Sequence, residues 1–223
     1  MEQALVTRGL NKNYGDLAAL VDLDLTVEAG VVFGFLGPNG AGKTTAIRVF
    51  MDEIRSSSGS ASILGHDVHQ DSVALHRKVG YLPSDLALYP NMTGTDLLQF
   101  FANLRGGVDS QYVNALSERL DAQMSKKIGD LSSGNRQKIG IIQAFMSNPE
   151  FVILDEPSAG LDPLIQRELQ ALMRETADAG GTVFLSSHTL SEVQRVADRV
   201  GIIRNGKLIA QESIASLRAK GIR

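Results

Sequence analysis

A glycine-rich segment near the start of the chain has the residue types and spacing that bind phosphate groups. Gly37, Gly40 and Gly42 are followed by Lys43 and Thr44, which fits the pattern Gly-x-x-x-x-Gly-Lys-Thr. Glycines let successive backbone N–H groups point inward at an anion, and the lysine can reach the terminal phosphates of a nucleotide. An apolar strand pattern precedes the loop and a helical pattern follows it. We therefore expect a nucleoside triphosphate site here, and not an ordinary glycine turn.

Two adjacent carboxylates supply the second part of this chemistry. Asp155 ends the apolar run 151–154, and Glu156 follows it directly. At the end of a strand, Asp155 is placed to hold a Mg²⁺ ion through water, and Glu156 to act as a base or to orient an attacking water. Acidic residues also end strands for structural reasons alone. Beside a phosphate loop, however, we expect the pair to be functional.

With further motifs in the same order, the chain resembles the ATP-binding-cassette (ABC) family, the nucleotide-binding subunits of ABC transporters. The resemblance covers about residues 4–210 and rests on the segments 37–45 (GPNGAGKTT), 131–138 (LSSGNRQK), 154–157 (LDEP), 158–163 (SAGLDP) and 186–188 (SSH). Segments 89–93 (YPNMT) and 186–190 (SSHTL) are most similar to the bacterial branch that exports drugs and antibiotics. The serine–glycine element ahead of the acidic pair is specific to this family.

The resemblance implies an ATP-hydrolysing enzyme with ATP and Mg²⁺ as cofactors, and it assigns roles to particular residues. Tyr14 would stack on adenine, although an exposed tyrosine in a turn is the plainer reading of that residue. Glu156 and His188 would be catalytic, with His188 contacting the γ-phosphate and orienting the water. Thr44 and Asp155 would hold the metal. The phosphates would be held by the loop residues Gly37, Pro38, Asn39, Gly40, Ala41, Gly42, Lys43, Thr44 and Thr45.

The resemblance also implies protein partners. Family members work as head-to-tail pairs, so Ser132 and Gly134 of a second ABC ATPase subunit would cover the γ-phosphate, in a homodimer or a heterodimer. The plainer reading of Ser132 is a helix N-cap. Asp162 would contact the partner across the dimer seam. Cargo would pass through a separate transmembrane permease subunit, which would hold the chain in the cytoplasm, peripheral on the inner face of the cell membrane.

The elements that must position these residues alternate between strand and helix. This pattern predicts an α/β fold of the P-loop NTPase, ABC ATPase type: a mostly parallel core sheet, an N-terminal antiparallel β part and a helical lobe inserted at about residues 84–134 within one domain, 1–223. Strands are expected at 4–8, 23–27, 31–36, 61–64, 78–82, 151–154, 182–186 and in a hairpin at 200–210 turned by Asn205-Gly206. Helices are expected at 46–53, from about 93 to the glycine pair 106–107, and at 112–120, 135–146, 163–179, 190–197 and about 213–220.

Composition excludes several other classes of protein. The chain has 22 Lys and Arg against 25 Asp and Glu, a net charge of −3, so nucleic acid is not an expected partner. It has no cysteine, which excludes disulfide scaffolds and thiol catalysis. The N-terminus lacks the pattern of a signal peptide, and the apolar runs are too short to span a bilayer.

The sequence departs from the family pattern at a few positions, which keeps other functions open. Ser84 stands where the family usually has a glutamine, with Asp85 as a candidate replacement, and Ser133 and Asn135 depart from the usual signature. The docking groove for the permease should lie near residues 84–90, with Leu86, Leu88 and Tyr89 exposed or packed in the lobe. One alternative is a soluble ABC ATPase acting on DNA or the ribosome, but no long coiled coil or second cassette is present. The other is a nucleotide-gated sensor without turnover. Export-branch relatives often carry another segment after the point corresponding to Arg223, so this is a short form or a shortened chain.

Overall fold

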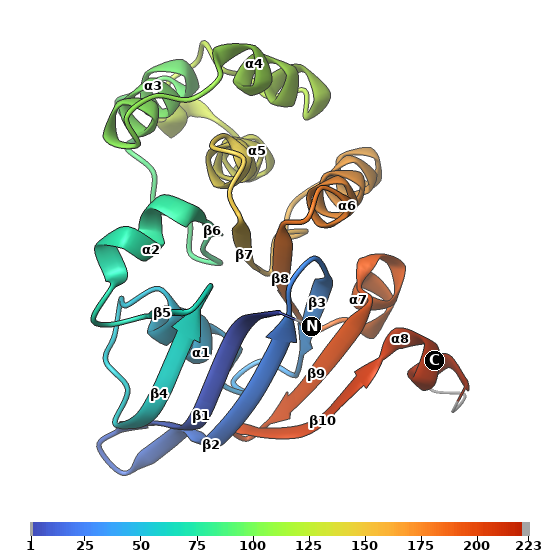
Figure 1. The fold of residues 1–223 in the computed structure, drawn as a ribbon. Helices are drawn as coiled ribbons and strands as arrows, with labels where there is room; N and C mark the ends of the chain where they lie inside the picture. Colours follow the sequence, from blue (N-terminus) through green and yellow to red (C-terminus); the bar gives the residue numbers. More distant parts are fainter. Residues whose placement is uncertain (1, 220–223) are drawn as a thin grey trace.

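The computed structural model describes residues 2–219 and contains two β-sheets (Figure 1). The first is antiparallel, in the order β2 (Leu17–Glu28), β1 (Gln3–Tyr14), β4 (Ser58–Ile63) and β5 (His66–Asp67). The second has the order β10 (Lys207–Ser213), β9 (Arg199–Arg204), β3 (Val32–Leu36), β8 (Thr182–Ser187), β7 (Phe151–Asp155) and β6 (Val79–Leu82). Neighbouring strands of the second sheet are parallel except in the β9–β10 hairpin. The predicted mostly parallel core sheet with an N-terminal antiparallel part is confirmed.

Helices cover the second sheet on both faces. On one face, α1 (Lys43–Phe50) contacts β7 and also β2 and β4 of the first sheet. On the other face lie α5 (Ser133–Phe145), α6 (Pro163–Asp178) and α7 (Leu190–Val196). Helices α3 (Gly94–Leu104) and α4 (Ser110–Arg119) precede α5 in the sequence and lie beyond it, farther from the sheet (Figure 1). Within the described residues, segment 84–134 contributes helices and no strand to either sheet.

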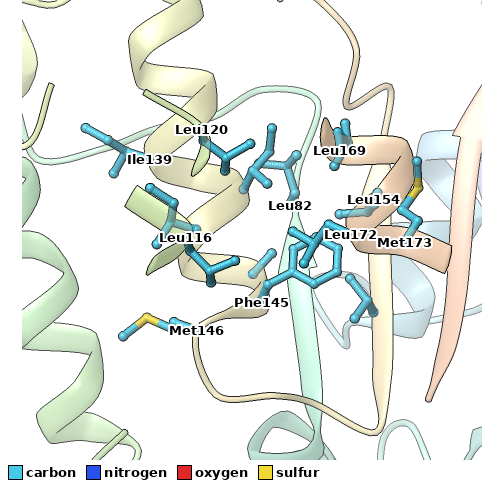
Figure 2. Packing of buried hydrophobic residues seen from close by; sticks show 14 of the residues in the cluster. Leu82, Leu116, Leu120, Ile139, Phe145, Met146, Leu154, Leu169, Leu172 and Met173 are labelled. Carbon is cyan, nitrogen blue, oxygen red and sulfur yellow. The ribbon is translucent and has the colours of Figure 1, made fainter. Parts of the chain in front are cut away.

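Strand β7 shows why the sheet needs cover on both faces. All five of its residues are buried. Phe151 and Ile153 pack into the cluster that contains α1 and the first sheet, whereas Val152 and Leu154 pack into the cluster built by α5 and α6. Figure 2 shows the second cluster, in which Leu154 lies near Leu172. Successive side chains of a strand point to opposite faces, so a continuous apolar run is what a doubly covered strand requires.

The sequence-based boundaries were wrong where local pattern and tertiary structure disagree. Strands β1 and β2 extend well beyond the predicted ranges 4–8 and 23–27. The sequence pattern missed the additional residues because β-bulges break the alternation and Gly9 has a positive φ of 49°. Helix α2 (Ser72–Lys78) was not predicted, since Leu75 is its one buried residue and leaves no apolar period. Helices α1 and α5 begin earlier than predicted, at Lys43 and Ser133.

The last element of the described chain is a short helix. Helix α8 (Ile214–Ala219) agrees with the start of the predicted last helix, whose expected end at Lys220 and Gly221 lies outside the described residues. Across residues 2–219, no helix combines the length and the apolar character that crossing a membrane requires.

Candidate functional site

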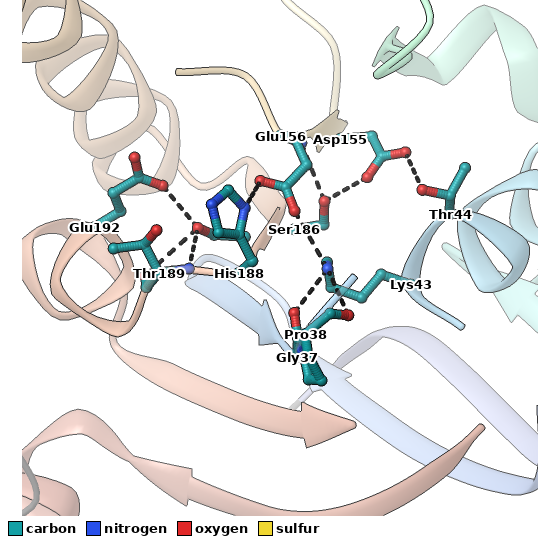
Figure 3. Close-up of polar contacts among 11 residues, drawn as sticks. Gly37, Pro38, Lys43, Thr44, Asp155, Glu156, Ser186, His188, Thr189 and Glu192 are labelled. Atoms are coloured by element: carbon teal, nitrogen blue, oxygen red, sulfur yellow. Dashed lines mark hydrogen bonds and ion pairs between the residues drawn. The ribbon is translucent and has the colours of Figure 1, made fainter. Parts of the chain in front are cut away.

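Strands β3, β8 and β7 are neighbouring and parallel, and they bring the motifs together at the edge of the second sheet formed by their carboxyl ends. Figure 3 shows the side chains that meet there. In the strand register, Asp155 at the end of β7 is paired with Ser186 of β8, and Ser187 is paired with Leu36 at the end of β3. The loop 37–42 therefore starts beside the carboxyl ends of β7 and β8. Ligands of parallel α/β sheets bind at this edge, because the loops that follow the strands converge there.

The phosphate loop is shaped by close backbone contacts. Gly42 has φ +107°, a conformation that side-chain-bearing residues rarely adopt, and it stands directly before α1. A Cβ atom on Gly37 would lie 2.4 Å from the carbonyl oxygen of Ile203 in β9. The turn after β9 also holds the loop, since the Gly206 N–H donates to the Ala41 carbonyl at 2.9 Å. The β9–β10 hairpin thus forms the rear wall of the loop.

Lys43 lies inside this loop and is buried. Its Nζ donates to the carbonyl oxygens of Gly37 at 2.7 Å and Pro38 at 3.3 Å. The same ammonium lies 3.2 Å from Oε1 of Glu156. The lysine charge is therefore held at the loop, next to the carboxylate that follows β7 (Figure 3).

Thr44 and Asp155 place two oxygen donors side by side. The Thr44 hydroxyl donates to Oδ2 of Asp155 at 2.9 Å, and Asp155 is fully buried. Its Oδ1 accepts from the hydroxyl of Ser186. Hydroxyl and carboxylate oxygens are the ligands that Mg²⁺ prefers, and this ion usually keeps several of its waters. The residues present therefore fit a magnesium ion.

Glu156 and His188 form the other end of the same network. The Nδ1 atom of His188 lies 2.8 Å from Oε2 of Glu156. The Glu156 side chain is mostly covered, whereas His188 is 56% exposed. One carboxylate thus lies between a lysine and a histidine at the mouth of the phosphate loop, where it can orient a water molecule.

A cavity of about 710 Å³ adjoins these groups. From the predicted set it is lined by Tyr14, Asn39, Gly40, Gly42, Lys43, Thr44, Thr45 and Glu156. Pro38, Asp155 and His188 adjoin it through the hydrogen bonds given above, and Gly37 and Ala41 belong to the loop itself. Tyr14 is 46% exposed at the end of β1, and Nζ of Lys12 lies 5.0 Å from its ring centroid.

Sequence reasoning missed part of the cavity wall. Leu17, Ala18, Ala19, Asn205 and Gly206 also line it, as does Ser84, while Asp85 does not. The Asn-Gly pair was recognised as a hairpin turn, but only the tertiary fold brings that turn to the phosphate loop. On β6 nearby, burial raises the pKa of Tyr81, and the carboxylates of Glu53 and Asp155 raise it further, so its phenol stays neutral.

The serine–glycine segment lies apart from this cavity. Ser132 caps α5, its hydroxyl accepting from the Asn135 N–H at 3.3 Å, and neither it nor Gly134 lines the cavity of the described chain. A Cβ atom on Gly134 would lie 2.7 Å from the carbonyl of Gly160, so the segment packs on the loop after β7. Asp162 of that loop caps α6, accepting from two backbone N–H groups.

Comparison with known proteins identifies the family of this chain. Residues 20–159 match the family model described as ABC transporter. The bacitracin transport ATP-binding protein BcrA of Enterococcus faecalis is 35% identical over 99% of this chain and 72% of its own length. The daunorubicin/doxorubicin resistance ATP-binding protein DrrA of Streptomyces peucetius is 32% identical over 97% of this chain and 67% of its own length.

Solved structures show the same fold. A structure of an ATP-binding subunit of an ABC transporter superposes with a TM-score of 0.91 at 28% identity, covering 99% of this chain and 94% of that one. A phosphate loop after β3, an acidic pair at the end of β7 and a family match over residues 20–159 lead to one assignment. The chain belongs to the ABC transporter family, as an ATP-binding subunit of the ATPase type.

Proposed function

We propose that this chain is the ATP-hydrolysing motor of an exporter, acting on a separate permease in the membrane. The names of two similar proteins, one for bacitracin transport and one for daunorubicin and doxorubicin resistance, support export of antibiotic-like cargo. The single observation that carries hydrolysis is the position of Glu156. Its carboxylate contacts both Lys43 and His188 beside the phosphate loop.

The residues at this edge of the second sheet have separate roles in the proposed reaction. The N–H groups of loop 37–45 and the ammonium of Lys43 bind the phosphates, and Lys43 exchanges its carbonyl contacts for phosphate oxygens. Tyr14 stacks on adenine at the open end of the cavity. Thr44 and Asp155 would hold Mg²⁺, which when bound neutralises charge on the phosphates. Glu156 orients and deprotonates the attacking water, and His188 holds the carboxylate in place.

A second ABC ATPase subunit completes the site. Ser132 and Gly134 stand at the N-terminus of α5, away from the cavity of their own chain, so they are free to face the nucleotide of another subunit. The serine hydroxyl and the positive end of the helix dipole suit a γ-phosphate. In a homodimer the contact is repeated by the two-fold axis, which gives two equivalent sites.

The permease would dock on the side of the helical lobe, 84–134. Tyr89 is 55% exposed, and its ring packs edge-on against Phe100 at a centroid distance of 6.0 Å. Leu86 and Leu88 pack instead against the core, so Tyr89 is the exposed apolar residue among the three considered from sequence. Exposed aromatic pairs of this kind are typical of contact surfaces. Docking there would hold the chain on the cytoplasmic face of the cell membrane.

Turnover of Mg·ATP by the purified chain, measured against protein concentration, tests the proposal. We expect a rate per chain that rises with concentration as dimers form, and a loss of about 10²–10⁴-fold in Glu156→Gln with ATP binding retained. ATP binding without turnover in both proteins, also in the presence of permease-containing membranes, would contradict it and favour a nucleotide sensor.

A further inference from the structure

Ser186 belongs to the segment 186–188 that carries the family resemblance, but no role has been assigned to it above. It lies in β8, directly beside Asp155 of β7 in the parallel register, and its side chain is fully buried. Its hydroxyl donates to Oδ1 of Asp155 and accepts the backbone N–H of Glu156 at 3.1 Å. One hydroxyl therefore contacts both members of the acidic pair from the neighbouring strand (Figure 3).

The first contact fixes the orientation of the Asp155 carboxylate. With Oδ1 engaged by Ser186, the opposite oxygen, Oδ2, is the one that faces α1 and accepts from Thr44 at 2.9 Å. A carboxylate that is fully buried is strongly destabilised when an oxygen lacks a hydrogen bond, because no water can replace the lost partner. Ser186 thus holds the carboxylate in an orientation in which one oxygen faces Thr44.

The second contact fixes the backbone of Glu156. This residue has φ +51°, in the left-handed region that non-glycine residues enter only when the surroundings enforce it. The strand ends at Asp155, so the next N–H has left the sheet ladder, and the Ser186 hydroxyl accepts it. Once the backbone is held this way, the Glu156 side chain reaches Lys43 and His188.

Other buried hydroxyl groups on β8 have different partners. The Ser187 hydroxyl donates to Glu192 at 2.6 Å and accepts from the Thr189 N–H, so it ties the strand to the start of α7. The Thr182 hydroxyl accepts from the Gly30 N–H at 3.0 Å, at the opposite end of the strand. Burial alone therefore does not bring a hydroxyl of this strand to the acidic pair. Ser186 makes the contact because the strand register places it beside Asp155.

We propose that Ser186 is a positioning residue that couples the two carboxylates, through one hydroxyl that aims Asp155 at the metal-binding side and holds the strained backbone of Glu156. The proposal rests on the roles given above to Asp155 and Glu156. It predicts that removal of the hydroxyl weakens metal-dependent nucleotide binding and also loosens the Glu156 backbone. If Ser186 only filled space, removal of its hydroxyl would have neither of these specific effects.

Amide hydrogen exchange of the complete chain without nucleotide is the first test, because it does not depend on ATP chemistry. In the parent protein, we expect the Glu156 amide to be protected although it follows the strand. In Ser186→Ala, its exchange should become at least about tenfold faster, as expected for loss of a hydrogen bond in a charged cluster. Thr182→Val removes a buried hydroxyl from the same strand and should leave Glu156 protection unchanged. Unchanged exchange of Glu156 in Ser186→Ala would overturn the proposal.

ATP affinity with Mg²⁺ and with EDTA is the second test. Ser186→Ala should reduce the gain in affinity that Mg²⁺ provides by about tenfold, while affinity in EDTA stays the same. Ser186→Thr keeps the hydroxyl and should restore the gain. An undiminished gain in Ser186→Ala would contradict the coupling role. If the parent chain binds no ATP, the proposed function fails, and the exchange experiment still decides the role of Ser186.

A third variant covers the case in which the alanine protein does not fold. Ser186→Cys replaces the hydroxyl with a slightly larger thiol, which is both a weak hydrogen-bond donor and a weak acceptor. It should give faster Glu156 exchange and a smaller Mg²⁺ gain than the parent. Parent-like values in a folded Ser186→Cys protein would overturn the proposal.

Discussion

The edge of the second sheet and the start of α5 differ in how completely the chain builds them. At the sheet edge, Lys43, Thr44, Asp155, Glu156 and Ser186 form one continuous network of hydrogen bonds and ion pairs, largely shielded from water. At the start of α5, Ser132 is exposed, and its hydroxyl is engaged by Asn135 of its own helix turn. The chain therefore preorganises the groups that would bind and hydrolyse ATP, and it leaves the proposed covering groups outside this network, away from its own cavity.

This difference has a physical reason. Groups that stabilise charge during a reaction work best when their positions are fixed beforehand, because no reorganisation is then needed. A surface that closes over a nucleotide must also open to release products, so it cannot be buried within its own chain. The groove of about 630 Å³ between α3 and α4 is lined by none of the predicted site residues, so this groove is separate from the proposed chemistry.

The same substitution at the sheet edge and at a helix cap in the lobe should give the largest contrast. Asp155→Asn removes a buried charge that faces Thr44, and turnover should fall about a hundredfold as support for the metal is lost. Asp109→Asn changes an aspartate that caps α4 in the lobe, where asparagine caps equally well. We expect its turnover to match the parent. Steady-state ATPase assays of both variants measure this difference in turnover. Equal losses of turnover in the two variants would contradict the prediction.

The covering role of Ser132 can be separated from its capping role. Aspartate and asparagine both cap helices, so Ser132→Asp and Ser132→Asn should keep α5 intact. Only the aspartate places a negative charge toward the γ-phosphate of a partner subunit, and its turnover should be at least about tenfold below that of the asparagine variant. Circular dichroism checks the fold and ATPase assays give the rates. Equal turnover in the two variants would argue against a phosphate opposite Ser132.

The rear wall of the phosphate loop should give a smaller effect. Gly206 and Gly65 have φ of +75° and +77°, so alanine is strained to the same degree at both. A Cβ atom on Gly206 would lie 2.7 Å from the carbonyl of Ala19, whereas Gly65 has open space. Gly206→Ala should raise the KM for ATP about fivefold, corresponding to about 1 kcal/mol, and Gly65→Ala should leave it unchanged. An equal rise in KM in both variants would mean that backbone strain, and not the close approach to Ala19, causes the effect.

The smallest effect is expected where the lobe meets α6. Arg119 of α4 pairs with Glu175 of α6 at 2.6 Å, and its guanidinium lowers the pKa of the Glu175 carboxyl. A lowered pKa in the folded state gives stability above the ordinary carboxyl value, and this stability is lost as pH falls through the lowered value. Because Glu175 is 58% exposed, solvent screening limits Glu175→Gln to a few tenths of a kcal/mol.

Urea unfolding of this variant and the parent, near neutral pH and at about pH 3, measures that difference. It should be present near neutral pH and should shrink in acid. A difference that grows as the pH falls would contradict the assignment.

The parts of the fold predictable from sequence are those that local pattern determines. Strands β3 and β7 are continuous apolar runs because both their faces are covered, and the phosphate loop follows from the glycines, lysine and threonine at fixed spacing between a strand and a helix pattern. Helix α2 lacked a signal because Leu75 alone is buried in it. The bulges of β1 depend on pairing with β2, which no local pattern encodes.

The site shows the same division. Lys43, Thr44, Asp155 and Glu156 were candidates from their motifs, and the structure brings them into contact. The link from Ser186 to the acidic pair depends on the register of two strands far apart in sequence, and the turn at Gly206 reaches the loop only through the tertiary fold. Neither contact has a sequence signal, because both arise from how β8 and β9 align with their neighbours.

If each chain supplies half of a working site, then two variants that are defective in different halves should restore activity when they are mixed. Lys43→Ala disables the phosphate loop, and Ser132→Asp disables the covering surface. In a mixed dimer, one site carries both defects and the other carries none. We expect each variant alone to have little turnover and an equal mixture to regain it, up to about a quarter of the parent rate if subunits pair at random. A mixture no more active than the separate variants would contradict the claim.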